Sequence, residues 1–348
     1  MHSQPSLFFI LGRPRSGTSL LRTLFDAHPN VKIPPEYPLL FHLYQKYRRV
    51  TEWTPDRVQE FIGFLRDRKI SKHLDFSHLE LDEDAFARDL AGLGRPASFS
   101  DLFLNLNLHA GSVFPKTEIL AVGDKNPVYS VYAGHLRKIF PGAKFICIVR
   151  DFRDNFASLR KFEFEAPNPY LQAYRWKYQI RRFIHYQRKY PQSFYIVRYE
   201  ELVADPEKTF MTLCGFLDIP YTDEVFTFYT RAEEILSHLP REVMERFMAG
   251  LKEPVNTSKI GLWRKSLSGH DVEILETVVG KYSDKMGYER TIRHRSFNIR
   301  LRSRIPSLYG FLLFRLMVLF SYLPYSVSSR FAGFLPRLAQ FYHRFIKS

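Results

Sequence analysis

The chain has 348 residues, 45% of them hydrophobic, which is enough for one large α/β domain or for a domain with an appendage. Its formal charge of +15 is typical of proteins that contact nucleic acid or an anionic surface. Its two cysteines, Cys147 and Cys214, lack the spacing of a metal or disulfide site, which argues against a disulfide-stapled fold and favours a reducing compartment.

Strand and helix patterns alternate through most of the chain. Short runs rich in apolar and β-branched residues predict strands at 7–11, 119–123, 144–149 and 194–197. Helical periodicity is found at 18–27, 37–49, 55–69, 84–93, 128–140, 152–162, 170–190, 206–217 and 271–285. This alternation predicts an α/β fold with a parallel sheet that has helices on both faces. Ligands of such sheets bind at the carboxyl ends of the strands.

The first strand runs directly into a turn bounded by glycines. Its five apolar residues, 7–11, are too few for a secretory signal, so the chain is expected to begin in the cytoplasm. Gly12, four residues, Gly17 and Thr18 follow the spacing of a P-loop, G-x-x-x-x-G-K-[ST], in which Thr18 replaces the phosphate-binding lysine. Arg13 and Arg15 in this turn favour a bound anion at the helix N-terminus over a turn that is merely tight.

A metal-free anion is the better prediction for this turn. A nucleoside triphosphate site needs a lysine and a Mg²⁺ ion held near a strand-end aspartate. Asp151 does follow a strand, but Arg150 stands beside it and would repel a metal ion. A P-loop kinase, the rival enzyme, would need a lysine at position 18 and Mg²⁺.

The stretch GRPRSGTSLLRTLFDAHPNV, residues 12–31, resembles the 5′-phosphosulfate loop of a known enzyme family. These are the sulfotransferases that use 3′-phosphoadenosine-5′-phosphosulfate (PAPS), in the branch that includes tyrosylprotein sulfotransferases and bacterial relatives. The resemblance covers about residues 6–288 and implies PAPS as cofactor, adenosine 3′,5′-bisphosphate as product and no metal. It implies that the 5′-phosphate and sulfuryl group are bound by Gly12, Arg13, Pro14, Arg15, Ser16, Gly17, Thr18 and Ser19.

A second phosphate site is predicted where another strand ends. In KFICIVRDFRDNFASLRKF, Arg150 follows the strand and Ser158 lies about two turns into the next helix. An arginine there can form a bidentate pair with a phosphate, and the Ser158 hydroxyl can donate a further hydrogen bond. The alternative is that Arg150 pairs with Asp151 or Asp154. The resemblance favours the phosphate and implies that it is the 3′-phosphate of the cofactor.

Two weaker likenesses extend the predicted nucleotide site. RYEEL, residues 198–202, resembles a family segment that brings Tyr199 near the nucleotide, with Glu201 where aspartate is more usual. TSKIGLWRKSLS, residues 257–268, resembles a late loop that closes over the adenosine. The resemblance implies that this loop brings four residues toward the base and the 3′-phosphate: Lys259, Gly261, Trp263 and Arg264. Trp263 could equally be a core residue.

Sulfuryl transfer needs a base for the attacking hydroxyl and cations for the charge that develops, by analogy with phosphoryl transfer. The resemblance implies that Glu36, just past the strand-like run 31–33, is the base, with a pKa raised by burial. It implies that Lys125 and Arg15 contact the sulfuryl or bridging oxygens. The alternatives are a helix N-terminal carboxylate for Glu36 and a pair with Asp124 for Lys125.

A histidine base is the other possibility, because the cytosolic small-molecule branch of the family uses one. His109 lies near the place in the sequence where such a base would be sought, but the surrounding pattern is not evident. His28, in DAHP, is more typical of a residue that ends its helix. Glu36 is therefore the preferred base.

Two segments complete the predicted organisation. Residues 53–114 are helical in pattern and are expected to form an insertion that carries acceptor specificity. From Arg290 to Ser348 there are ten Arg, one Lys and no Asp or Glu, so this segment supplies +11 of the charge. We therefore expect a sulfotransferase domain of residues 1–289 and a basic, aromatic-rich helical tail of residues 290–348.

The tail predicts contact with a surface rather than a membrane crossing. Residues 309–323 are apolar, but they are fewer than the 20 or so that span a bilayer and they include Arg315. Beyond them, apolar residues recur at helical spacing, and Arg330, Arg337 and Arg344 repeat every seven residues. An anionic membrane surface bound through residues 308–346 is favoured. Packing on protein, including a second subunit, is the main alternative, and nucleic acid is not expected.

The function expected from these features is transfer of a sulfuryl group from PAPS to a hydroxyl of a carbohydrate, a lipid or another alcohol. The enzyme is expected in the cytoplasm, peripheral on the inner face of a membrane, and a homodimer is possible. The rival from another class is a non-catalytic nucleotide-binding peripheral membrane protein.

Overall fold

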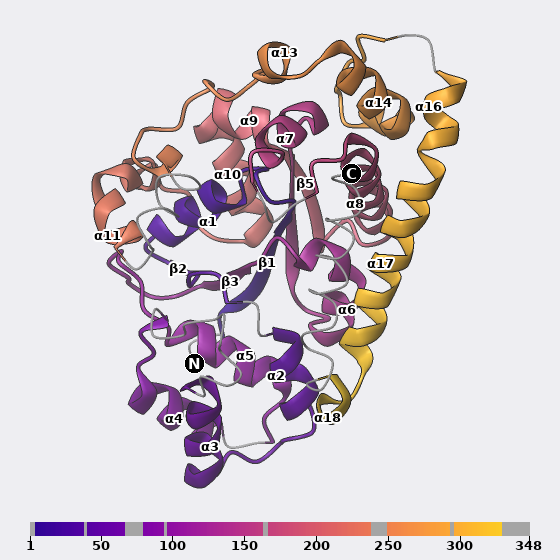
Figure 1. Ribbon diagram of the computed structural model, residues 1–348. Coiled ribbons are helices and arrows are strands. Elements are labelled where there is room, and N and C mark those ends of the chain that lie inside the picture. The colour runs from indigo at the N-terminus through magenta and orange to yellow at the C-terminus, as the bar shows by residue number, and fades with distance from the viewer. Residues whose placement is uncertain are drawn as a thin grey trace.

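A five-stranded parallel sheet forms the centre of the molecule (Figure 1). The computed structural model describes residues 4–37, 40–66, 79–93, 96–162, 166–237, 249–292 and 296–328. The strands are β1 (Ser6–Gly12), β2 (Val31–Lys32), β3 (Ala121–Lys125), β4 (Lys144–Val149) and β5 (Phe194–Arg198). Their order is β2-β3-β1-β4-β5, and all four pairings are parallel, which confirms the predicted α/β class.

Alternate residues of β1 enter two separate cores. Phe9 and Leu11 belong to the core on one face of the sheet, whereas Phe8 and Ile10 belong to the core on the other face. The first face is covered by α5 (Phe99–Leu108), α6 (Tyr129–Ile139) and α8 (Pro169–Lys189). The second face is covered by α1 (Thr18–Ala27) and α10 (Pro206–Leu217). Burial on both faces explains why β1 reads as a continuous apolar run.

The strand order determines where a ligand can bind. β1 lies between β3 and β4. After β1 the chain first forms β2 and β3 on one side of it and then β4 and β5 on the other side. Loops at such a topological switch point form the ligand crevice of open α/β sheets. The turn after β1 is therefore at the place where the fold itself favours a binding site.

Most predicted helices are present with ends shifted by a few residues, and α1 and α10 have the predicted bounds. The others are α2 (Leu40–Tyr47), α3 (Pro55–Arg66), α4 (Glu83–Ala91), α7 (Phe152–Leu159), α14 (Gly269–Val279) and α15 (Lys281–Lys285). One helix predicted at 271–285 is two, because Gly280 takes a positive φ of 59° and ends α14. The third strand also lies two residues later than predicted, because Asp124 and Lys125 pair with β1.

The described residues of the region 53–114 are mainly helical, as expected. Its helices α3, α4 and α5 gather with α2 at one end of the molecule, and α5 packs on β3 (Figure 1). Helix α5 begins with a capping box in which Ser98 and Asp101 bond to each other's backbone. The remaining short helices are α9 (Tyr199–Ala204), η2 (Glu224–Arg231), α11 (Ala232–Leu236), η4 (Ala249–Leu251) and α13 (Trp263–Ser266).

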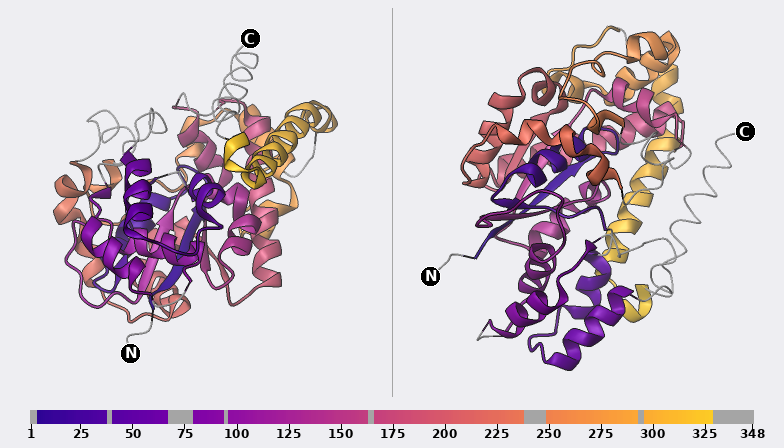
Figure 2. Two further views of the ribbon diagram at one scale, coloured as in Figure 1. Left: turned by 90° about the horizontal axis from the view of Figure 1, so that it is seen from below. Right: turned by 90° about the vertical axis from the view of Figure 1, so that its left-hand side faces the viewer.

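The C-terminal segment forms a long helix along the outside of the molecule. It consists of α16 (Phe297–Arg302), α17 (Arg304–Tyr322) and α18 (Tyr325–Ser328), and α17 lies against α8 and α6 (Figures 1 and 2). The run Phe297–Tyr322 has 26 residues and is long and apolar enough to cross a membrane, by length and composition. The expectation that the apolar run is too short is therefore wrong, because the helix begins well before Tyr309. The amphipathic helix predicted beyond residue 328 lies outside the described residues.

Candidate active site

The turn after β1 is held in a strained, closely packed conformation. Gly12 approaches α1 and β4 so closely that a Cβ atom would lie 2.6 Å from Thr18 Cγ2 and 2.7 Å from Ile148 Cγ2. Arg15 takes a φ of 67°, a left-handed conformation that costs about 1–3 kcal/mol and clusters at functional sites. Asn155 of α7 holds the turn by donating to the Pro14 carbonyl (2.8 Å) and to Ser16 Oγ (3.2 Å).

The turn leads into a helix N-terminus that is open to an anion. Gly17, with a φ of 93°, is the N-cap of α1, and among the described residues no side chain caps this helix end. The first N–H groups of α1, which include those of Thr18 and Ser19, are therefore free of side-chain acceptors there. Aligned N–H groups and the positive end of the helix dipole attract a phosphate or sulfate group. Thr18 occupies the position of the P-loop lysine.

The two arginines of the turn point in different directions. Arg13 is buried and donates to the Gln172 carbonyl (3.2 Å) and to Gln172 Oε1 on α8. Only its backbone remains in the turn, so the expectation that both guanidinium groups face the anion is not what the structure has. Arg15 Nε donates to Ser158 Oγ (3.1 Å), and its guanidinium lies 5.1 Å from the centre of the Phe162 ring.

Arg150 lies in the same cationic group as Arg15. It donates to the carbonyls of Arg15 (3.0 Å) and Lys259, and its guanidinium lies 4.7 Å from the centre of the Tyr199 ring. The alternative pairing with Asp151 is not formed, because Asp151 instead bonds to Arg153 (2.7 Å). The two predicted members of the second phosphate site, Arg150 and Ser158, therefore meet through Arg15.

Electrostatics favour an anion among these cations. Burial and the neighbouring Arg150 lower the pKa of Arg15 from its ordinary value. Burial, Arg15 and Arg150 likewise lower the pKa of Lys259. A bound dianion would relieve this mutual repulsion. The group borders a hollow lined by Arg15, Gly17, Thr18, Ser19, Leu20, Arg150, Tyr199, Gly250, Leu251 and Lys259.

Tyr199 forms the back of this hollow. A Cβ atom on Gly17 would lie 2.5 Å from Tyr199 Cδ2, so the ring packs directly on the turn and leaves no room for a side chain. The ring also supports the Arg150 guanidinium from one side. Tyr199 thus lies against the turn after β1, and its predicted place beside a nucleotide stays a prediction.

The loop of residues 257–268 is held to α7 by Asp154, for which the sequence suggested only a pair with Arg150. The Asp154 carboxylate accepts from the N–H groups of Gly261 (2.7 Å) and Trp263 (2.8 Å). Trp263 is buried against Ala157 and Val272, so the alternative that it is a core residue holds. Arg264 is exposed on the other side of the Trp263 ring, at 4.7 Å. In this loop Lys259 reaches the hollow, whereas Trp263 does not.

The predicted base and the predicted lysine lie together on the other side of the turn. Lys125, at the end of β3, forms an ion pair with Glu36 and a hydrogen bond with Ser19 Oγ (3.3 Å). Lys125 is almost wholly buried, whereas the Glu36 side chain is 37% exposed. Burial, with Arg22 nearby, lowers the pKa of Lys125 well below its ordinary value. The alternative pair of Lys125 with Asp124 is replaced by this one.

Arg22 is a site residue that the sequence analysis missed. It donates to the carbonyls of Pro34 (3.2 Å) and Ile33 (3.3 Å), and so it holds the segment that carries Glu36. It also pairs with Asp26 one helical turn later (3.4 Å). The sequence did contain a signal for Arg22: it lies four residues after Thr18, so the two side chains share one face of α1.

Both candidate histidine bases are occupied elsewhere. His28 Nε2 bonds with the Pro220 carbonyl (2.8 Å), and its Nδ1 accepts from the Asn30 N–H (3.1 Å). It is the C-cap residue of α1, as predicted, and burial lowers its pKa. His109 ends α5 and pairs with Asp89 (2.9 Å). Among the three candidates, only Glu36 lies beside the lysine at the turn.

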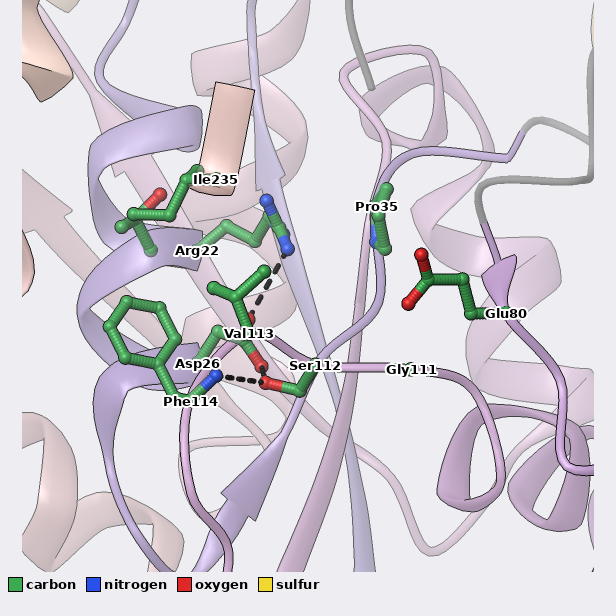
Figure 3. A pocket seen from close by; sticks show the side chains of 10 residues that line it. Arg22, Asp26, Pro35, Glu80, Gly111, Ser112, Val113, Phe114 and Ile235 are labelled. Atoms are coloured by element: carbon green, nitrogen blue, oxygen red, sulfur yellow. Dashed lines mark hydrogen bonds and ion pairs between the residues drawn. The ribbon is translucent and has the colours of Figure 1, made fainter. Parts of the chain in front are cut away.

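A second hollow lies at the segment that ends just before Glu36 (Figure 3). Its lining combines Arg22 and Asp26 of α1 with Pro35, the neighbour of Glu36, and with residues near the helical insertion. These include Glu80 and Ser112, whose hydroxyl donates to Asp26 (3.0 Å). Val113, Phe114 and Ile235 add apolar surface. The hollow therefore offers both charged and apolar contacts to a molecule that approaches the Glu36–Lys125 pair. The described residues include no cluster of three or more metal-ligating side chains.

Comparisons with known proteins agree with this geometry. Residues 5–223 match the model of a family described as the sulfotransferase family. A protein-tyrosine sulfotransferase of Drosophila melanogaster is 26% identical over 293 residues, which cover 81% of this chain and 52% of that protein. Protein-tyrosine sulfotransferase 1 of Danio rerio is 25% identical over 291 residues, covering 81% and 72%. The chain thus spans about half the length of the Drosophila protein.

A solved structure shows the same fold. The sulfotransferase domain from the Synechococcus PCC 7002 olefin synthase superposes with a TM-score of 0.56 at 22% identity. The match covers 83% of this chain and 97% of that domain. The shared elements include the parallel sheet that positions the turn after β1.

Proposed function

The chain belongs to the sulfotransferase family, and from that premise we propose that it transfers the sulfuryl group of PAPS to a hydroxyl group. The observation that carries the proposal is that two separate groups of cationic side chains lie at the turn after β1. Arg15, Arg150 and Lys259 lie on one side of the turn, and Lys125 lies with Glu36 on the other side. A nucleotide with phosphates at both the 3′ and 5′ positions has the charge distribution that such a site requires.

The cofactor is assigned to the turn and to the first cationic group. The 5′-phosphate and the sulfuryl group would be held by the backbone of residues 12–17 and by the first turn of α1, which includes Thr18 and Ser19. The 3′-phosphate would be held by Arg150 and Ser158, with Arg15 between them. The pKa values support this fit: besides burial, Arg150 lowers the pKa of Arg15, and Arg15 and Arg150 lower the pKa of Lys259, so an anion bound among these cations would be stabilised. Arg15 is thereby assigned to the 3′-phosphate end more than to the sulfuryl group.

The Glu36–Lys125 pair is assigned the transfer step. Glu36 accepts the proton of the acceptor hydroxyl while the hydroxyl oxygen attacks the sulfur atom of PAPS. A new O–S bond forms and the S–O bond to the 5′-phosphate breaks, which leaves adenosine 3′,5′-bisphosphate. Lys125, next to Ser19 of the turn, stabilises the negative charge on the oxygens around sulfur. Burial of Lys125 strengthens this interaction, since charges attract more strongly away from water.

The acceptor is proposed to approach through the hollow of Figure 3. This hollow is lined by Pro35, the residue before Glu36 in the chain, and by Arg22, Asp26 and Glu80. The relatives in Drosophila melanogaster and Danio rerio are named protein-tyrosine sulfotransferases, so a peptide tyrosine joins carbohydrate and lipid alcohols among the acceptors to be tested. We also propose that the enzyme works in the cytoplasm at the inner face of a membrane, on the strength of its basic C-terminal segment.

Calorimetry with the intact chain tests the proposed cofactor. We expect adenosine 3′,5′-bisphosphate to bind without Mg²⁺ and more tightly than ATP. Tighter binding of ATP that requires Mg²⁺ would instead favour the P-loop kinase. A screen of tyrosine peptides, carbohydrates and lipid alcohols with labelled PAPS then tests the reaction. If no acceptor is labelled and if Glu36→Gln and Lys125→Ala change nothing measurable, the non-catalytic alternative stands.

A further inference from the structure

The C-terminal helices carry an apolar stripe that nothing in the described chain covers. Six side chains on the run Phe297–Tyr322 have exposed fractions between 50% and 78%. They are Phe297, Leu301, Ile305, Leu308, Leu312 and Leu319. At about 100° per residue, these positions fall within roughly a quarter of the helix circumference. We call this set the outer stripe.

The opposite face of the same helix is already occupied. Gly310 lies so close to α8 that a Cβ atom would be 2.7 Å from Tyr174 Cδ1, and the Phe314 and Tyr178 rings are 4.8 Å apart. Nearer the C-terminus, His135 of α6 bonds with Ser321 Oγ (2.7 Å), and Gln45 donates to the Phe320 carbonyl (3.0 Å). The helix is therefore fixed to the outside of the domain by one face (Figures 1 and 2), and the exposed side chains of the outer stripe lie on its other face.

Positive charge surrounds the outer stripe. Arg300, Arg304 and Arg315 lie on the helix itself, and from residue 290 to the C-terminus the sequence contains no Asp or Glu. The neighbouring helices add cations of their own. Arg181 of α8 and Arg315 both act on Tyr174, and Lys138 of α6 lies 5.6 Å from the centre of the Tyr322 ring. An apolar stripe edged by arginines is typical of helices that lie in an anionic membrane interface.

We propose that the outer stripe docks the enzyme on an anionic lipid surface, with the helix lying in the interface. A crossing orientation conflicts with the contacts to α6 and α8, which would have to enter the hydrocarbon together with His135 and Gln45. A second copy of the chain fits less well. A symmetric contact would bring the same arginine-edged surfaces together and repel. Lipid phosphates supply the opposite charge.

Vesicle flotation of the full chain tests the docking. We expect binding to vesicles of phosphatidylcholine mixed with phosphatidylglycerol, weak binding to pure phosphatidylcholine, and release by high salt. Ile305→Glu and Leu308→Glu, tested singly, should each weaken binding to the mixed vesicles about tenfold or more. Met211→Glu is the matched control, because Met211 is an equally exposed apolar residue on α10, which covers the other face of the sheet. It should leave vesicle binding unchanged.

Several results would overturn the proposal. One is a full chain that does not bind the mixed vesicles, and another is full vesicle binding by both stripe variants. Sedimentation without vesicles provides a further check, since self-association that Ile305→Glu abolishes, without vesicle binding, would identify a second copy as the occupant. Adenosine 3′,5′-bisphosphate binding, measured on every variant, keeps failure of this proposal distinct from failure of the proposed transferase activity.

Discussion

At the scale of single residues, the Glu36–Lys125 pair gives the most specific prediction about the transfer step. Glu36→Gln removes the proton acceptor but retains the size of the side chain, so we expect kcat to fall by about 10²–10⁴-fold. Binding of adenosine 3′,5′-bisphosphate should change little, because the 3′- and 5′-phosphates are assigned to other groups. Steady-state kinetics with labelled PAPS and calorimetry measure the two effects.

Glu52→Gln is the control for this substitution. Glu52 is exposed, just before α3, and its substitution should leave both rate and affinity unchanged. If Glu36→Gln keeps the rate of the unaltered enzyme, Glu36 is not the base, and the assignment returns to the histidines.

Ser158 tests the assignment of the 3′-phosphate. Ser158→Ala removes one hydroxyl, and the loss of one hydrogen bond to a charged group is worth about 1.5–3 kcal/mol. We therefore expect affinity for adenosine 3′,5′-bisphosphate to fall by about tenfold to a hundredfold. Affinity for adenosine 5′-phosphate, which lacks the 3′ group, should be unaffected. Equal weakening of both nucleotides in calorimetry would show that Ser158 does not act on the 3′-phosphate.

Motif spacing could predict backbone positions at this site better than side-chain directions. Spacing identified the turn and Arg150, and the family resemblance pointed to Glu36 and Lys125 as separate residues; that these two pair with each other is seen only in the structure. Spacing did not predict that Arg13 turns to Gln172, because that partner lies 159 residues away in the sequence. Trp263 is buried for a similar reason, since its neighbours Ala157 and Val272 belong to other helices. Packing between distant segments decides which way a side chain points.

At the scale of elements, the contact between α17 and α8 depends on one glycine. Gly310→Ala would place a Cβ atom 2.7 Å from the Tyr174 ring, so either the ring or the helix must move. Such overpacking costs about 1–3 kcal/mol, and replacing a helical glycine by alanine returns about 0.5–1 kcal/mol, so we expect the free energy of unfolding in urea to fall by about 1–2 kcal/mol. Gly63→Ala, in α3, is the control because a Cβ atom there meets nothing within 4 Å. It should stabilise the protein by about 0.5–1 kcal/mol. Equal stability of Gly310→Ala and the unaltered chain would contradict the close contact.

His135 makes the same interface sensitive to acid. Burial, with Lys138 and Arg48 nearby, lowers the pKa of His135 to about 4. The unfolded chain takes up the proton near pH 6.5, so stability is lost as the pH falls from about 6.5 to about 4. The loss is at most about 1.4 kcal/mol per pH unit. Urea unfolding at neutral pH and near pH 5 measures it, and His135→Gln should flatten this part of the pH profile. An unchanged slope in the variant would assign the loss to other groups.

The bounds of the helices and strands show which local sequence signals were sufficient to predict where an element ends. Helices α1 and α10 were predicted correctly because each has a clear stop, at the DAHP segment and at Asp218, which caps α10 in a left-handed conformation. The β3 strand was predicted two residues too early because Asp124 and Lys125 look like a polar turn. They continue the strand because β1 provides backbone partners for both. Propensity therefore failed where tertiary pairing decided the conformation.

At the scale of the whole molecule, the alternation of strands and helices predicted the parallel sheet but not its order. β1 pairs with β3 and β4, each more than 100 residues later in the chain, and nothing local to a strand specifies such partners. The order matters for function, since it places the phosphate-binding turn at the switch point between the two halves. The division of the chain at residue 289 stays a prediction, although α17 packs on α6 and α8.

The same architecture separates the proposed nucleotide site from the proposed lipid-binding stripe. The outer stripe belongs to α16 and α17, which run along the outside of the molecule (Figure 1). The hollow assigned to the nucleotide is lined by residues of the turn between β1 and α1. Lipid and nucleotide should therefore bind without competing. We expect calorimetry with adenosine 3′,5′-bisphosphate to give the same dissociation constant with and without saturating phosphatidylglycerol vesicles. Ile305→Glu, which should not bind the vesicles, supplies the comparison. A loss of nucleotide affinity that appears only with vesicles would mean that lipid phosphates enter the Arg15–Arg150 group, because that group is also built to attract phosphate.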